Sequence, residues 1–345
     1  MSNLKISETY NYDYTTLPNS MTECSNGDFI IVGRAFNKTD NSSAFAIRVA
    51  SNGTMLWDKI YDTPFTQFFS SIATLSDGNF IAVGTFSYSI FAGDEYLWIV
   101  KLDNDGNILF QNAIGTVGVQ SNGLGVCATS DGGYTIVAQS IPNGVPSSIV
   151  LKFNSENKIE WQKTFDVGIA HSIKETMDGG FVLSGAKLIN ESLLSNPFIL
   201  RLNEFGDSLW LNIFDDYKVY VLLDSDIIEM ENGHFAMVAK SVILETDAMG
   251  NLLWAKQDTS YVLNSIVEVS NESFGISGSV IINNYDHAYI ALIGEKANST
   301  IWSNTEILYP SAMQKLLLLN DDYFAACGYA PSNNRNSLTF FSIFK

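Results

Sequence analysis

A short segment that recurs along the chain places the strongest limit on the fold. In each clear copy, a turn pair such as Asp-Gly or Asn-Gly precedes a tight apolar run that ends in Gly or Ala. Five clear copies lie at 24–33, 75–84, 129–138, 176–185 and 230–239, and two weaker ones at 270–278 and 319–328. Gly and Asn accept positive φ, so these pairs favour hairpin turns. The repeat predicts seven similar β-units.

A second motif follows the first within each unit and ends in an aromatic residue. That position is filled by Trp57, Phe110, Trp161, Trp210, Trp254 and Trp302, which are 44 to 53 residues apart. Each unit therefore consists of four short strands, A to D, with the Asp-Gly turn between A and B and the aromatic residue on D. Strand B is apolar nearly throughout, which indicates burial on both faces, as in sheets stacked around an axis.

The two ends of the chain complete each other. The seventh unit ends without a Trp strand, and Ile6–Tyr10 aligns with Trp57–Tyr61. We therefore predict an all-β, seven-bladed β-propeller of four-stranded antiparallel blades, closed by an N-terminal strand that completes the last blade. The single domain spans residues 1–345, with approximate blades at 18–61, 62–114, 115–165, 166–214, 215–257, 258–305 and 306–345 plus 4–10.

These motifs resemble the units of bacterial seven-bladed β-propeller repeat families, which follow the pattern T-D-G-G-(F/Y)-I-V-x-G … L-(D/N)-x-x-G-x-x-W. The resemblance covers almost the whole chain and is strongest in the first four units. It implies a scaffold or binding module, often an exported one. The same fold also hosts enzymes, so the fold alone does not decide the function.

Charge and hydropathy narrow the possible partners and the location. The formal net charge is −18, which disfavours nucleic acid and anionic membrane surfaces. No apolar run reaches the roughly 18 residues of a membrane span. The sequence as given begins without a signal peptide, so we expect a cytoplasmic protein unless a leader was removed. We expect a monomer that does not insert into membranes.

No motif predicts a metal or a cofactor. Cys24, Cys127 and Cys327 lie in apolar runs, and the three histidines fall on separate blades. Gly123–Ala128 matches a dinucleotide pattern but lies in a predicted strand, with no helix to follow. Asp103–Asn107 lacks the glycine and glutamate spacing of a calcium loop. We therefore expect no cofactor and no metal.

Variable loops locate the candidate ligand-binding face. The A–B and C–D turns are short and uniform, whereas the D–A and B–C connections vary and share one face of a propeller. Variable loops on a rigid ring commonly carry binding sites. The predicted ligand-binding residues are Tyr12, Tyr14, Phe65, Gln67, Phe68, His171, Tyr217, Tyr220 and Tyr261. The alternative is that several of these side chains pack beneath their own loops.

Two functions remain open from the sequence. The first is a non-enzymatic binding or scaffolding protein that uses the loop-rich face to bind a protein partner, a small ligand or a glycan. The alternative is an enzyme or carbohydrate-binding protein with its pocket at the mouth of the central channel, where His171 is the candidate general base.

Two sets of charged residues are expected to have roles other than catalysis. The first set should form a solvated acidic edge, and it consists of Asp215, Asp216, Asp224, Asp226, Glu229 and Glu231. A structural role, with stems against a neighbouring blade and charges reaching solvent or a carboxylate, is expected for Arg48, Lys101, Lys152 and Arg201.

Overall fold

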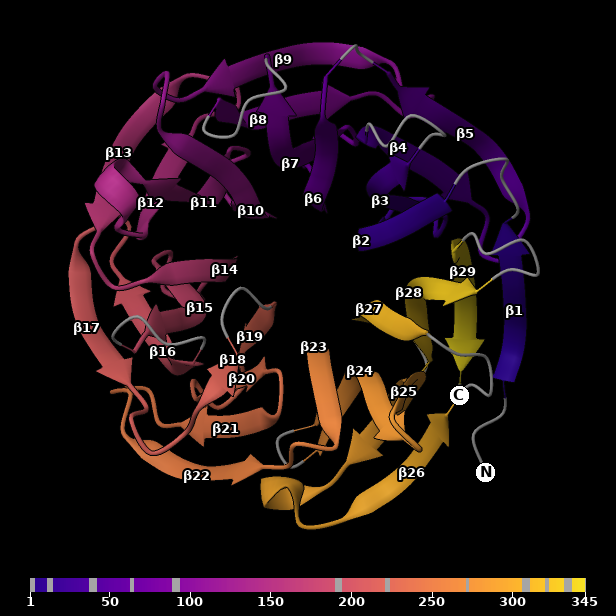
Figure 1. Cartoon of the computed structure of the whole chain (residues 1–345), viewed down its shortest axis with the longest axis vertical. Helices are drawn as coiled ribbons and strands as arrows, with labels where there is room; N and C mark the ends of the chain where they lie inside the picture. The colour runs from indigo at the N-terminus through magenta and orange to yellow at the C-terminus, as the bar shows by residue number, and fades with distance from the viewer. Residues whose placement is uncertain are drawn as a thin grey trace.

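Seven antiparallel sheets surround a central channel in the computed structural model (Figure 1). The structure describes residues 4–10, 15–36, 42–62, 65–88, 94–189, 194–220, 224–270, 273–305, 311–319, 323–331 and 337–344. The ring confirms the predicted seven-bladed propeller. None of the helices in these ranges is long and apolar enough to cross a membrane.

Each blade orders its strands from the channel outward. Blade 1 contains β2 (Thr15–Glu23), β3 (Phe29–Phe36), β4 (Ser42–Val49) and β5 (Met55–Tyr61). Blade 2 contains β6 (Gln67–Thr74), β7 (Phe80–Ser87), β8 (Glu95–Leu102) and β9 (Ile108–Ile114). Blade 3 contains β10 (Gln120–Ala128), β11 (Tyr134–Ile141), β12 (Ser147–Phe153) and β13 (Ile159–Phe165), with the short helix η1 (Pro142–Gly144) between β11 and β12.

The remaining blades repeat this order. Blade 4 contains β14 (Ile169–Glu175), β15 (Phe181–Leu188), β16 (Leu194–Leu202) and β17 (Ser208–Ile213), and β18 (Val219–Tyr220) also pairs with β16. Blade 5 contains β19 (Ser225–Glu229), β20 (Phe235–Ala239), β21 (Val242–Thr246) and β22 (Leu252–Gln257). Blade 6 contains β23 (Tyr261–Ser270), β24 (Ser273–Ile282), β25 (Tyr285–Ile293) and β26 (Thr300–Thr305), with η2 (Glu295–Ala297) before β26.

Blade 7 closes the ring with both ends of the chain. It contains β27 (Ala312–Leu318), β28 (Phe324–Pro331) and β29 (Ser337–Phe344), and β1 (Leu4–Tyr10) adds the outer strand by antiparallel pairing with β29. The Tyr10 hydroxyl donates to the Gly53 carbonyl of blade 1 at 2.8 Å, as the Tyr61 hydroxyl donates to Gly106 of blade 2 at 2.8 Å. The predicted closure by the N-terminal strand is confirmed.

The Asp-Gly-Gly segment of blade 4 shows how the repeat builds its turn. Gly179 has φ of 82°, a conformation that favours glycine. The Asp178 carboxylate accepts from the Thr176 hydroxyl at 2.7 Å and from the Gly180 N–H at 3.2 Å. Asp178 also forms an ion pair with Arg201 of strand C at 2.5 Å. The turn is thus fastened to its own blade by the two charges that the repeat supplies.

The same ion pair recurs in the first four blades. The basic residue of strand C reaches the aspartate of its own A–B turn in Arg48–Asp28, Lys101–Asp77, Lys152–Asp131 and Arg201–Asp178. In blade 5 the carboxylate lies on strand C instead, where Glu245 contacts His234 Nδ1 of the A–B turn at 2.8 Å. The expectation that these basic groups reach a carboxylate is confirmed, and the carboxylate belongs to the same blade.

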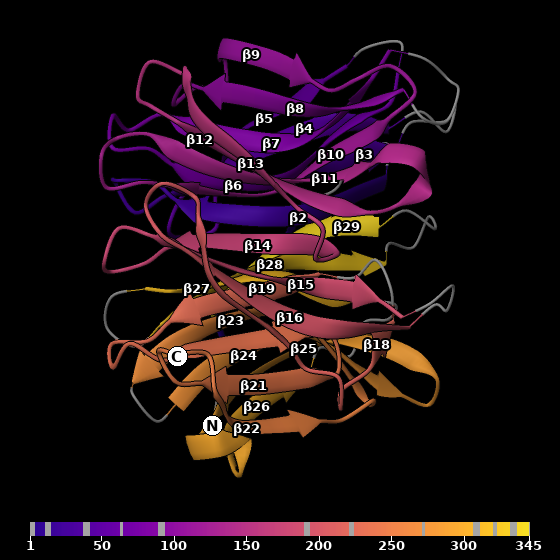
Figure 2. The ribbon, with the colours of Figure 1, turned by 90° about the vertical axis from the view of Figure 1, so that its left-hand side faces the viewer.

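Outer-strand tryptophans join successive blades. The Trp57 indole N–H donates to the Asn104 carbonyl at 3.1 Å, and Trp161 donates to the Glu204 carbonyl at 3.2 Å. Strand B is buried on both faces, as in the all-buried start of β3 (Phe29–Phe36). Seen edge-on, the strands run mostly across the thickness of the ring (Figure 2). The apolar core therefore lies between sheets, which leaves polar side chains for the channel.

Candidate functional site

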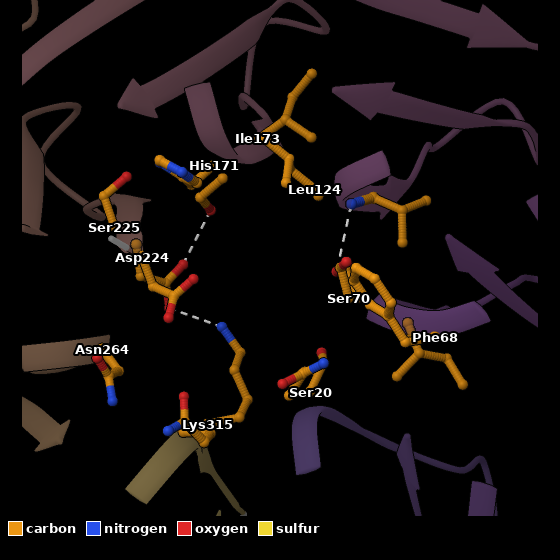
Figure 3. Close-up of a pocket in the computed structure, with 18 of the residues that line it drawn as sticks. Ser20, Phe68, Ser70, Leu124, His171, Ile173, Asp224, Ser225, Asn264 and Lys315 are labelled. Carbon is orange, nitrogen blue, oxygen red and sulfur yellow. Dashed lines mark hydrogen bonds and ion pairs between the residues drawn. The ribbon is translucent and has the colours of Figure 1, made fainter. Parts of the chain in front are cut away.

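The channel contains a cavity of about 420 Å³ that is lined by the inner strands of all seven blades (Figure 3). Most of its polar surface comes from hydroxyl and amide groups, which are supplied by Asn19, Ser20, Ser70, Ser71, Gln139, Ser172, Ser225, Asn264 and Gln314. Apolar side chains such as Leu17, Phe68 and Leu124 complete the wall. Its size and mixed lining suit a small ligand.

A repeated β-bulge places these side chains in the channel. The register between strands A and B shifts at the same position in six blades, and the skipped residues are Asn19, Ser70, Leu124, His171, Asn264 and Gln314. All six residues line the cavity. A bulge bends its strand and redirects a side chain. In each of these six blades, the bulge therefore adds one residue to the channel wall.

The glycine at the end of strand B permits that bulge. A Cβ on Gly84 would lie 1.9 Å from the Phe68 carbonyl oxygen, and one on Gly278 would lie 2.0 Å from that of Val262. In these two blades strand A passes too close for a side chain at this position, whereas in blade 3 Ala138 fits opposite Gly123. The last glycine of the apolar run was the sequence signal for the channel residues, and the sequence analysis did not use it.

His171 lies in the channel wall, as predicted, on the bulge of β14. Burial lowers the pKa of this imidazole, Asp224 opposes the shift and Lys240 adds to it. Its Nδ1 is buried and has no hydrogen-bond partner within the described ranges. A general base normally needs an orienting partner on its second nitrogen. The geometry holds His171 neutral but does not equip it as a base.

Asp226 is the centre of a hydrogen-bonded cluster that joins four blades. Its carboxylate accepts from Ser172 of blade 4 at 3.0 Å, from Ser265 of blade 6 at 2.8 Å and from the Lys315 ammonium of blade 7 at 2.7 Å. It also accepts from the N–H of Ile227 at 3.1 Å. Burial would raise the pKa of Asp226, but the charges of Lys315 and Lys174 and the hydrogen bonds lower it to about 2.

The prediction of a solvated acidic edge is therefore wrong for Asp226, which is 3% exposed. Glu229 is half-buried and accepts from the Met177 N–H of the preceding blade at 2.6 Å. Glu175 and Glu268 accept from Ser130 and Glu231 in the same way, at 2.7 and 3.0 Å. These glutamates end strand A and fix the A–B turn of the neighbouring blade. Asp215 and Asp216 are exposed, as expected.

The predicted ligand-binding residues of the loop-rich face lie in different environments. Tyr220 is 67% exposed, whereas Gln67 is 1% exposed and donates to the Tyr61 carbonyl. The Phe68 ring lies beneath the Arg34 guanidinium, whose Cζ is 3.6 Å from the centroid of the ring. Tyr217 packs on the core of blades 4 and 5, Tyr261 packs against Tyr289, and Phe65 is partly buried. Tyr12 and Tyr14 lie outside the described residues.

Large exposed apolar side chains do occur around this face, but most of them belong to residues that were not among the predicted ligand-binding residues. They belong to the D–A and B–C connections or to the strand ends beside them, and they are Tyr88, Val117, Val145, Leu188, Tyr220, Ile281, Ile282 and Tyr285. Sequence reasoning favoured aromatic residues and so missed the aliphatic ones. Their exposure depends on how neighbouring loops pack, which the repeat does not encode.

Metal and thiol chemistry find no support in the described ranges. No group of three or more His, Cys, Asp or Glu residues is arranged to hold a metal ion in this part of the chain. Cys24, Cys127 and Cys327 are buried and unpaired. Burial raises the pKa of Cys24 to about 11 and those of the other two to about 12, so all three stay protonated at neutral pH.

Comparison with known proteins supports the fold alone. No family model matches this sequence, and no curated protein matches it either. A protein of unknown function from Dyadobacter fermentans has 10% identity and a TM-score of 0.58, with 100% of this chain and 99% of that chain covered. Kuenenia stuttgartiensis hydrazine synthase has 12% identity and a TM-score of 0.57, with 96% of each chain covered. YCF48 bound to D1 peptide has 11% identity and a TM-score of 0.54, with 98% and 97% covered.

Proposed function

We propose that the chain is a non-enzymatic binding or scaffolding propeller whose loop-rich face holds a protein partner. The supporting observation is the set of exposed apolar side chains around that face. Val117 is 78% exposed, Tyr220 67% and Val145 62%, and they lie on three different connections. Exposed apolar groups that share one face favour a protein contact over random surface variation.

Charge indicates what kind of partner fits. Among the described residues, exposed carboxylates on the connections of this face are those of Asp62, Asp166, Asp215, Asp216, Asp224 and Asp258, against the exposed ammonium groups of Lys187 and Lys218. An acidic surface that surrounds apolar contacts suits a partner with basic residues around an apolar segment. A propeller of this fold, YCF48, is known in complex with a peptide.

The enzymatic alternative has less support. Hydrazine synthase shows that an enzyme can share this fold. In this chain, however, the channel carboxylate Asp226 is fully engaged by hydrogen bonds, and His171 lacks an orienting partner within the described ranges. The neutral imidazole and the engaged carboxylate do not form an acid–base pair, so binding is the better proposal.

Affinity capture with two matched triple variants tests this proposal. The loop-face variant carries Val117→Ser, Val145→Ser and Tyr220→Ser. The control carries Leu56→Ser, Leu109→Ser and Leu209→Ser on the outer strands, where the side chains are 51 to 56% exposed. Captured proteins are quantified by mass spectrometry at low and high salt.

We expect a partner with a basic surface that is lost with the loop-face variant, kept with the control and weakened by salt. The proposal fails if the wild-type protein captures nothing in stoichiometric amount. It also fails if both variants retain the same partner.

A further inference from the structure

Two lysines in the channel wall interact electrostatically with one carboxylate, that of Asp226. Lys315 of β27 donates to Asp226 at 2.7 Å, and Asp226 receives its other hydrogen bonds from Ser172, Ser265 and the N–H groups of Ile227 and Ile266. Lys174 of β14 lines the same cavity, three residues beyond His171. Among the described residues, no hydrogen bond or ion pair reaches the Lys174 ammonium, and its side chain is half-buried in the channel wall.

The charge balance of the cavity is opposite to that of the protein. The lining carries the cations Arg34, Lys174 and Lys315 against the carboxylates Asp224 and Asp226. Two charged groups outside the lining interact with it electrostatically: the Glu95 carboxylate with Arg34, and the Lys240 ammonium with His171. Their charges are opposite, so they do not change the balance. His171 is held neutral, so the cavity keeps an excess of one positive charge within a chain of net charge −18.

This excess is concentrated at Lys174. The charge of Lys315 and the burial lower the pKa of Lys174, and the charge of Asp226 only partly opposes that shift. A half-buried ammonium without a partner is unfavourable beside another cation, and an anion next to it would remove the penalty. Asp226 has no free hydrogen-bonding capacity to offer, because five groups already donate to it.

We propose that the channel binds a small hydroxylated molecule through one oxyanion, a carboxylate or a phosphate, which pairs with Lys174 beside Lys315. The hydroxyl and amide groups of Ser20, Ser70, Asn264 and Gln314 line the same space and supply hydrogen bonds for the hydroxyl groups of the ligand. The cavity of about 420 Å³ has room for a molecule of monosaccharide size. This site lies below the loop-rich face and is independent of the protein partner proposed there.

Isothermal titration calorimetry with four probes tests the site. D-glucuronate presents a carboxylate, D-glucose 6-phosphate presents a phosphate, inorganic phosphate lacks hydroxylated carbons, and D-glucose is neutral. The test variant is Lys174→Gln, which removes the charge at this position. Lys174→Arg is a control that keeps the charge. Lys158→Gln removes the same charge at an exposed position, where the side chain is 73% accessible.

We expect saturable binding of glucuronate or glucose 6-phosphate and much weaker binding of glucose. Lys174→Gln should weaken the binding about tenfold or more, because a charge-assisted contact is lost. Lys174→Arg and Lys158→Gln should stay within about threefold of the wild-type protein. The carboxylate and phosphate probes show which oxyanion is preferred.

Two results would overturn the proposal. One is that none of the anionic probes binds at millimolar concentration, in which case the channel holds only water. The other is that Lys174→Gln binds the anions as well as the wild-type protein does. Thermal unfolding checks that the variant is folded, and its melting temperature should not fall, because the repulsion from Lys315 is relieved. Neither result bears on the partner capture at the loop-rich face.

Discussion

Replacing Asp226 with Asn tests how strongly the buried carboxylate holds four blades together. The substitution keeps the shape of the side chain and removes its charge. The Lys315 ammonium, 2.7 Å away, then loses its counter-ion, and the hydroxyls of Ser172 and Ser265 compete for one remaining acceptor oxygen. Removing one partner of a buried ion pair costs about 3 to 5 kcal/mol.

The lowered pKa of Asp226 gives a second, independent value for the free energy by which this carboxylate stabilises the fold. A change from 3.8 to about 2 corresponds to about 2.5 kcal/mol at 1.36 kcal/mol per pKa unit. A melting entropy of about 2.1 cal/mol/K per residue gives about 0.7 kcal/mol/K for 345 residues. The expected loss of 3 to 5 kcal/mol therefore lowers Tm by about 4 to 7 °C.

Thermal and urea unfolding at pH 7 measure this loss. The double variant Asp226→Asn, Lys315→Met should recover part of it, because the unpaired ammonium is gone. Since the folded-state pKa is lowered, the carboxylate stabilises the wild-type fold above about pH 4, and this contribution disappears as the pH falls toward 2. The reasoning is refuted if Asp226→Asn costs less than about 1 kcal/mol, or if the double variant is no more stable than the single one.

Three further predictions concern the turns, the closure and the channel histidine. Gly206→Ala should destabilise the fold by about 2 to 4 kcal/mol in urea unfolding, because the new Cβ would lie 2.7 Å from the Trp161 ring and the residue has a φ of 77°. The Cβ of Gly179→Ala would meet no atom within 4 Å, so this variant should cost only about 1 to 2 kcal/mol. Equal costs would contradict this packing. Deleting Leu4–Tyr10 exposes the edge of β29, so size-exclusion chromatography should show larger species in place of a single folded peak. The folded-state pKa of His171 lies below 6.5, so wild-type stability should fall as the pH drops below 6.5, and His171→Gln should show a smaller loss between pH 7 and pH 5. Parallel profiles for the two proteins would refute that assignment.

The ring itself could be predicted from the sequence. The Asp-Gly turns, the apolar strand B and the Trp position recur at nearly constant spacing, so each unit is determined by local contacts and by its two neighbours. Closure followed from the same repeat, because residues 4–10 match the strand that the seventh unit lacks. The structural role of the strand C cation also followed from its regular recurrence.

Only the tertiary structure determined the content of the channel. Asp226 looked like part of an exposed acidic segment, yet it meets side chains 39 to 89 residues away and becomes buried among them. The bulges on six of the inner strands decide which of their residues face the channel, since a shift of one residue turns a side chain to the opposite face. Local spacing fixes the strands and their order. The meeting of seven inner strands at one axis decides which charges are buried together, and no local pattern records that.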